Sequence, residues 1–319
     1  MSNVKMALSG RIHWQLINPD GSIEIEGHQS NLILDSGLNE FAGVSDAEFT
    51  GFRNALGLGT NGTLPNAAQT NLLAPVQSLS TSDGGFASEA VNSYVANPGL
   101  NVWRAECTVV KTVTLTANRN IAEFALFSST ISSVASIREV PRDGNGDPIV
   151  ISALSGQIFK LNHTLRVDIP YTEVARNFTI LGAGVQSGTE AWFRSSVANQ
   201  GQISDLFSIA APAAGVMVKP ITNASPLTPT TNPIYVFADT IFVNGAAISY
   251  TAGSFQRIKR TVIPPSGFVG NVGGWAVVFG QISNTRNAGY KFVLTSGNYV
   301  KSNLKQLTLD FTVSWGRAP

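Results

Sequence analysis

A glycine-rich stretch, Gly57-Leu-Gly59-Thr-Asn-Gly62, has the G-x-G-x-x-G spacing of the loop that cradles the phosphates of a dinucleotide. That fingerprint needs a buried strand before it, a helix that opens directly after it, and an acidic residue about 20 positions on, at the end of a second strand. Here Thr63-Leu-Pro65 follows the glycines, and Asp83 lies in a Ser-Asp-Gly-Gly turn. The context therefore favours a loop that uses glycine for its conformational freedom, without a bound phosphate.

A calcium loop is the second chemistry that the spacing suggests. Asp143, Asn145 and Asp147 alternate as the first ligands of such a loop do, but Leu154 stands where the loop has its bidentate glutamate. An incidental turn is the favoured interpretation.

Other metal and nucleophile chemistry has little support. The three histidines (His13, His28 and His163) are far apart, and neither an H-x-x-x-H pair nor a Cys/His cluster is present. Cys107 is the single cysteine, so no disulfide can form within the chain, and we expect it to be a small buried hydrophobe. No G-x-S-x-G nucleophile elbow is present.

Two weaker groups remain. Glu24 and Glu26 share one face of an expected strand, as two glycosidase carboxylates would on neighbouring strands, but a solvated acidic strand is the common explanation. Basic and aromatic residues near the C-terminus have the composition of a single-strand nucleic-acid surface, although alternation alone also explains them. They are Phe255, Arg257, Lys259, Arg260, Tyr290, Lys291 and Phe292. We therefore predict no enzyme activity, no catalytic, cofactor-binding or metal residues, no cofactor and no nucleic-acid partner.

The elements that would position these residues are strands. Residues 102–121 alternate between an apolar face, interrupted by Lys111, and a threonine-rich face, which is the period of a half-buried strand. The turn residues 118–120 then predict a hairpin with a deeply buried partner strand at 121–127. Trp103 and Cys107 are expected in the core, and the threonine-rich face against another subunit or the C-terminal half.

The chain is predicted to be all-β, with antiparallel β-sandwich domains, long hairpins and one or two short helices. The N-terminal domain spans residues 1–176 and contains an opening hairpin, the Gly-rich loop, a helix capped by Asp35-Ser36, and two possible helical turns at residues 65–73. The C-terminal β-rich domain spans residues 177–319 and ends with a strand at 305–316.

Composition points to a subunit with covered surfaces. Only 13% of the 319 residues are charged, which is about half the usual share. Residues 1–50 carry two Lys/Arg against seven Asp/Glu, whereas residues 257–319 carry eight Lys/Arg against Asp310 alone. These opposite charges can meet within one fold or between copies. The sequence has no signal-peptide pattern and no 18-residue apolar run, so we expect a soluble protein without a membrane partner.

Several segments resemble a family of tailed-bacteriophage virion proteins. Asn31-Leu-Ile-Leu-Asp-Ser-Gly-Leu38 is similar to its "N-L-I-x-D-x-G-L" segment, and the stretch from Leu56 to Leu72 to its "hxxGTGTxxPxxxQTxL" loop. Ile121-Ala-Glu-Phe-Ala-Leu-Phe127 resembles its "hxEhGLF" strand, with Ala125 where glycine is usual. Arg138, the 143–148 turn, the strand from Phe159 and the closing residues 307–317 follow in the family's order. The likeness is good over the first 170 residues, moderate over the last dozen and nearly absent over 177–300.

The resemblance implies a non-enzymatic virion protein of the tail, neck (collar) or baseplate, assembled in the cytoplasm of a bacterial host. Its expected partners are copies of itself and other virion proteins. The alternatives are a fibre module that binds host-surface glycans through Trp192 or Trp275, a capsid decoration protein and, less favoured, a glycan-cleaving enzyme.

Overall fold

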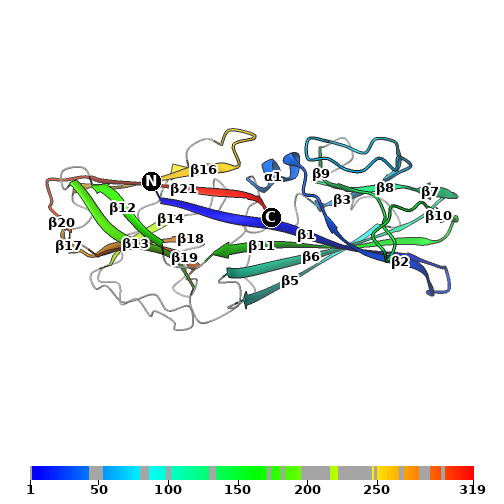
Figure 1. Cartoon of the computed structure of the whole chain (residues 1–319), viewed down its shortest axis with the longest axis horizontal. Coiled ribbons are helices and arrows are strands. Elements are labelled where there is room, and N and C mark those ends of the chain that lie inside the picture. The colour runs from blue at the N-terminus through cyan, green and yellow to red at the C-terminus, as the bar shows by residue number, and fades with distance from the viewer. Residues whose placement is uncertain are drawn as a thin grey trace.

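The computed structural model describes residues 2–42, 53–79, 86–97, 102–128, 134–170, 174–180, 184–194, 216–221, 246–247, 250–265, 269–279, 288–295 and 299–319. The described chain is built almost entirely of strands, with one short helix, so the all-β prediction is confirmed. It is elongated, with a β-rich body at each end (Figure 1).

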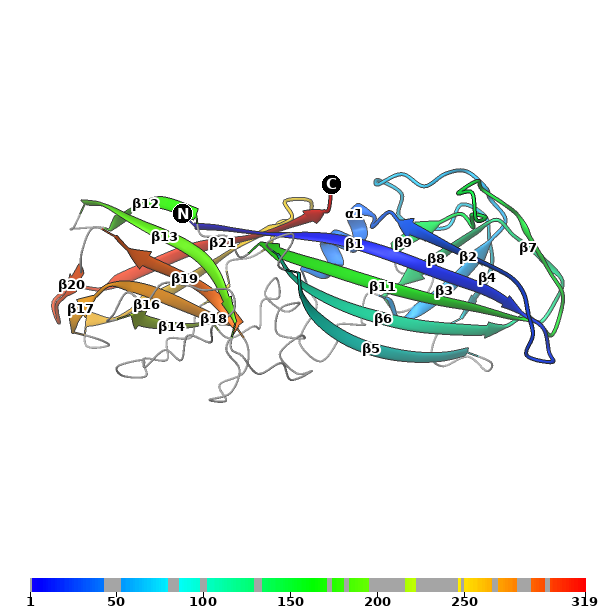
Figure 2. The ribbon, with the colours of Figure 1, turned by 60° about the horizontal axis from the view of Figure 1, so that its bottom comes forward.

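One large sheet runs through both ends of the molecule. It has eight strands, in the order β15-β16-β21-β1-β11-β6-β5, with β2 also paired to β1. Their bounds are β1 (Ser2–Ile17), β2 (Ile23–Asn31), β5 (Phe86–Asn97), β6 (Val102–Thr114), β11 (Ile158–Pro170), β15 (Ala246–Ala247), β16 (Gln256–Ile263) and β21 (Leu307–Arg317). Figure 2 shows β1, β11, β6 and β5 side by side.

Strand β1 takes part in two kinds of pairing along its length. Its first half, from Ser2 to Leu8, pairs in parallel with β21, whereas its second half pairs antiparallel with β2. The other pairings of this sheet are antiparallel. The sheet is therefore antiparallel, as expected, except at β1–β21, where the first and last strands of the chain pair in parallel.

A smaller sheet faces the N-terminal part of the large one. Its order is β4-β3-β8-β9, with bounds β3 (Ala55–Gly59), β4 (Pro75–Leu79), β8 (Glu123–Phe127) and β9 (Ala135–Glu139). The short pair β7 (Arg119–Ile121) and β10 (Ile151–Ala153) lies beside it. The core between the layers includes Trp14, Phe124 and Phe159. Hydrophobic burial of this kind is the main stabilising term of such a fold.

The predicted hairpin between residues 102–121 and 121–127 is wrong. Strand β6 ends at Thr114, and the chain beyond it bonds to the turn before β11, where Leu115 N–H donates to Gln157 O (2.9 Å). The chain then crosses to the facing sheet, where β8 pairs with β3 and β9. Deep burial of residues 121–127 is confirmed, because β8 is covered on both faces.

The one helix among the described residues, α1 (Asp35–Phe41), is bonded to the last strand of the chain. Its N-cap is Leu34 without a side-chain cap, so the predicted Asp35-Ser36 cap is wrong. Asp35 instead pairs with Arg317 (2.5 Å), and Trp315 Nε1 donates to Leu38 O (2.7 Å). The acidic N-terminal and basic C-terminal segments thus meet within one fold.

The remaining strands form a five-stranded sheet, β12-β13-β19-β18-β14, and the pair β17-β20. Their bounds are β12 (Val174–Ile180), β13 (Gly184–Arg194), β14 (Val216–Ile221), β17 (Gly270–Val272), β18 (Gly274–Phe279), β19 (Ala288–Leu294) and β20 (Tyr299–Lys301). The division predicted at residue 176 falls inside β12, and the predicted closing strand corresponds to β21. Residues 222–243 of the predicted C-terminal domain lie outside the described residues.

Candidate functional site

A buried ion pair holds the loop between β3 and β4. Glu123 begins β8 and Arg138 lies in β9, and Arg138 Nε donates to Glu123 Oε2 over 2.7 Å. Both side chains are fully buried. An ion pair taken out of water needs further hydrogen bonds to compensate its desolvation, and here the loop supplies them.

The loop contributes backbone and side-chain groups to both ends of the pair. Glu123 accepts the N–H groups of Leu73 (3.1 Å) and Ala74 (2.7 Å). Arg138 donates to Gln69 Oε1 (3.0 Å) and Thr63 O (3.0 Å). Residues 60–74 are thus fixed at several points although they have no regular structure.

The two helical turns predicted at residues 65–73 are wrong. The structure has a turn there, closed by two hydrogen bonds between Asn66 and Gln69. Asn66 N–H donates to Gln69 Oε1 (3.0 Å), and Gln69 N–H donates to Asn66 O (3.2 Å). Polar side chains that bond to the local backbone compete with a helix, and the contacts to Glu123 draw the following residues away from a helical path.

Position 59 requires glycine, because neighbouring atoms lie too close to leave room for a Cβ atom. A Cβ placed there would lie 2.4 Å from Glu123 Oε1 and 2.7 Å from Ala74 O. The G-x-G-x-x-G match therefore reflects, at least at Gly59, packing against the ion pair. No helix follows Gly62 in the described loop, so the context that a dinucleotide site needs is missing.

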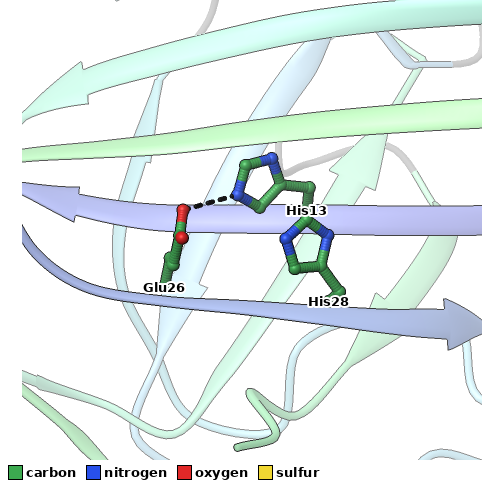
Figure 3. A group of neighbouring side chains, drawn as sticks. All are labelled: His13, Glu26 and His28. Atoms are coloured by element: carbon green, nitrogen blue, oxygen red, sulfur yellow. Dashed lines mark hydrogen bonds and ion pairs between the residues drawn. The ribbon is translucent and has the colours of Figure 1, made fainter. Parts of the chain in front are cut away.

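A second polar group lies on the outer face of the β1–β2 hairpin (Figure 3). His13 of β1 is directly opposite His28 of β2, and their rings stack with centroids 3.9 Å apart. His13 Nε2 and Glu26 Oε2 are 2.9 Å apart. The sequence-based statement that the histidines are far apart is wrong for this pair. Counting outward from the Ile17–Ile23 pair would place Gly27 opposite His13, and the register shift between Leu16 and Ile17 brings His28 there instead.

His163 belongs to a buried cluster on the inner face of the large sheet. Arg53 Nη1 donates to His163 Nδ1 (2.9 Å), so the ring proton is on Nε2, which donates to Asn31 Oδ1 (3.1 Å). Burial lowers the pKa of His163 well below its ordinary value and keeps the ring neutral. Arg53 also donates to the sulfur of Cys107 (3.1 Å).

The same burial acts on two neighbours of this cluster. The Cys107 side chain is fully buried, as predicted, and burial raises the pKa of its thiol. Burial also lowers the pKa of Lys111, which interrupts the apolar face of β6, to about 8. An inert thiol and a neutral imidazole fit a structural role.

The threonine-rich face of β6 forms a polar ladder with β11. Thr108 and Thr164 are joined through their hydroxyls (2.7 Å). Next to them Arg166 pairs with Glu106, and Arg104 makes a bidentate pair with Asp168. Thr108 and Thr112 are half-buried, and Thr114 is exposed. The expected contact of this face with another subunit stays a prediction.

The remaining sequence candidates do not come together as sites. Asp143 Oδ1 accepts the N–H groups of Asn145 (2.8 Å) and Asp147 (3.0 Å), which is a turn closed by its own side chain. Glu24 bonds to Gln157 and is separate from the Glu26 contacts.

The basic and aromatic C-terminal residues are split between β16 and β19. Arg257 is buried with its guanidinium 5.6 Å from the Tyr250 ring centroid, Phe292 is buried, and Arg260 is paired with Asp310. The described side chains of this set therefore form no single basic-aromatic surface, and those of Lys259, Tyr290 and Lys291 lie outside the described part. Trp192 and Trp275 lie in β13 and β18, but their side chains, like that of Trp103, lie outside the described part.

Comparisons with known proteins gave no match: no family model, no curated protein and no solved structure is similar to this chain. Within the described ranges, no helix is long and apolar enough to cross a membrane.

Proposed function

We propose that this chain is a non-enzymatic structural protein of a tailed-phage virion, located in the tail, neck or baseplate and acting through contacts with other subunits. The observation that carries the proposal is the Glu123–Arg138 pair with its loop. Gly59 and Gln69 lie in the segment that resembles the family's loop, Glu123 in the "hxEhGLF" strand, and Arg138 follows in the family's order.

The residues that match the family's segments are spread over 80 positions of the sequence. If these matches were due to chance, the matched side chains would have no physical reason to contact one another. Here they form one buried network, which supports their origin in a shared structural unit. The network holds residues 60–74 in place and leaves Leu64 (52% exposed) and Leu73 (47% exposed) on the surface. A loop that is already ordered loses less conformational entropy when it docks on a partner.

The mechanism is passive association. Apolar area removed from water contributes roughly 25 cal/mol per Å². A surface with few charges has few ions to desolvate, and 13% charged residues meets this condition. Strand β5, at one end of the described large sheet, offers an edge to which a neighbouring strand can add.

Sedimentation of the purified chain from micromolar to millimolar concentration, followed by binding to purified virion components, tests the proposal. We expect a defined multimer or a stable complex. A ring of six or twelve copies in the native particle would support the neck or baseplate. Three copies would support the fibre alternative, and hundreds the decoration alternative. A chain that stays monomeric at millimolar concentration and binds no virion component would overturn the proposal.

The part played by the loop has its own test. Leu64→Asp with Leu73→Asp is expected to weaken association, because two charges would have to be desolvated at the contact. Leu304→Asp, at a more exposed leucine (86%) in the turn before β21, is the matched control and should leave association unchanged.

A further inference from the structure

The hairpin of β1 and β2 brings three metal-ligating side chains to one point of the outer face (Figure 3). His13 and His28 are cross-strand partners, and Glu26 precedes His28 by two residues on the same face of β2. One ligand atom from each of the three residues can be chosen so that all lie within 4.8 Å of one another. Antiparallel pairing sets this convergence, because directly opposite side chains project to the same side of the sheet.

We propose that His13, Glu26 and His28 form a binding site for a divalent late transition-metal ion, such as Zn²⁺ or Cu²⁺. Two imidazoles and a carboxylate are ligands that zinc takes at about 2.0–2.2 Å. Ligand atoms around such an ion lie roughly 3.4 Å apart, so small side-chain rotations close the site. The donor set disfavours Ca²⁺ and Mg²⁺, which select oxygen ligands.

Neighbouring groups orient the ligands. Gln15 Nε2 donates to Glu26 Oε2 (2.8 Å), and Asn162 Nδ2 lies 3.4 Å from His13 Nδ1. The amide of Asn162 can turn its oxygen to accept Nδ1–H, which leaves His13 Nε2, the atom beside Glu26, as the metal ligand. Partners of this kind fix the ring orientation in known metal sites.

Charge also favours a cation at this point. Glu26 Oε2 accepts a hydrogen bond from Gln15 Nε2 and lies beside His13 Nε2, so the carboxylate places a negative charge where the three ligand atoms converge. Each of the two stacked imidazoles can offer one ring nitrogen as a ligand, and the carboxylate adds a negative charge. Three protein ligands leave at least one coordination position for water or for a group from a partner, as in open zinc sites.

Calorimetric titration of the full-length protein with Zn²⁺ tests this site, and the test does not depend on the proposed virion role. We expect one saturable equivalent of Zn²⁺, with Ca²⁺ failing to compete. His28→Ala and Glu26→Gln should each weaken binding at least tenfold, since even loss of a residue that only orients a ligand costs 10–100-fold. Both side chains are exposed, so the fold should survive, which circular dichroism can verify.

Glu24→Gln is the matched control, because it removes one carboxylate from the same strand outside the cluster, and it should bind like wild type. Electron paramagnetic resonance of the Cu²⁺ complex adds a structural signature. Coupling to two imidazole nitrogens is expected in wild type and to one in His28→Ala. Absence of saturable Zn²⁺ binding would overturn the proposal, and so would equal affinity in wild type, His28→Ala and Glu26→Gln.

Discussion

Arg138 Nε and Glu123 Oε2 lie 2.7 Å apart with both side chains fully buried, and the loop of residues 60–74 is built around them. The pair joins the first residue of β8 to β9, the last strand of this sheet. Its neighbours are the loop's own backbone groups, so the pair and the loop conformation depend on each other.

Removal of one charge of this pair should therefore lower the free energy of unfolding substantially. Arg138→Met is expected to lower the free energy of unfolding by about 3–5 kcal/mol, because it leaves the Glu123 carboxylate buried without its counter-ion. Urea unfolding measures the change. Arg260→Met is the control, since it breaks a bidentate pair with Asp310 at the surface and should have a much smaller effect. Equal effects of the two substitutions would show that burial of the first pair is unimportant.

Gly59→Ala should destabilise the same region by sterics alone. The added methyl group would meet Glu123 and Ala74, neither of which can retreat from the buried network, at an expected cost of about 1–3 kcal/mol. Gly62→Ala is the matched control, because the nearest atom to its added Cβ is 4.0 Å away. Thermal unfolding should separate the two variants, and a stable Gly59→Ala protein would contradict the close approach.

Trp315 should contribute more to the free energy of unfolding than the packing of its side chain alone. Its indole N–H donates to Leu38 O, and replacement by phenylalanine leaves that carbonyl without this donor, at an expected cost of about 1–3 kcal/mol beyond lost packing. Trp14→Phe is the comparison, because the buried Trp14 Nε1 has no hydrogen-bond partner among the described residues. Chemical denaturation of both variants gives the difference. Equal losses of unfolding free energy in the two variants would show that Trp315 stabilises the fold through packing alone.

Glu139 should make stability depend on pH. Burial raises the pKa of its carboxyl from 4.5 to about 7, although its hydrogen bond from the Leu32 N–H acts the other way. Below pH 4.5 the group is protonated in both folded and unfolded chains. As pH rises from 4.5 to 7 the unfolded chain loses this proton first, so stability falls through that window.

Glu139→Gln removes this dependence while retaining an acceptor for Leu32. Its advantage over wild type in unfolding free energy should grow with pH by up to about 3 kcal/mol at pH 7. Urea titrations at several pH values between 4 and 8 measure it. A difference that is constant with pH would mean that the pKa of Glu139 is not raised in the folded protein.

Local alternation predicted the strands well because it reports which face of a strand is buried. The hairpin of β1 and β2 could be predicted from its turn residues, and the burial of β8 from a run that is apolar on both faces. Which strands pair with β6 could not be predicted, because its alternation is equally compatible with β8 and with the actual neighbours β5 and β11.

The candidate sites were missed for a related reason. Glu123 and Arg138 become partners only through the pairing of β8 with β9, and His13 meets His28 only in one register of the hairpin. A shift of one residue would send every side chain of β2 to the opposite face. Sequence distance therefore understated how close these groups are.

The divided pairing of β1 has a consequence for the order of events during synthesis. Ser2 pairs with Phe311, so the edge of β1 from Ser2 to Leu8 cannot pair with β21 until residues 307–317 have been synthesised. Contacts between residues so distant in sequence form slowly. A nascent or truncated chain without β21 would carry an open strand edge on β1, to which a strand of another chain can add.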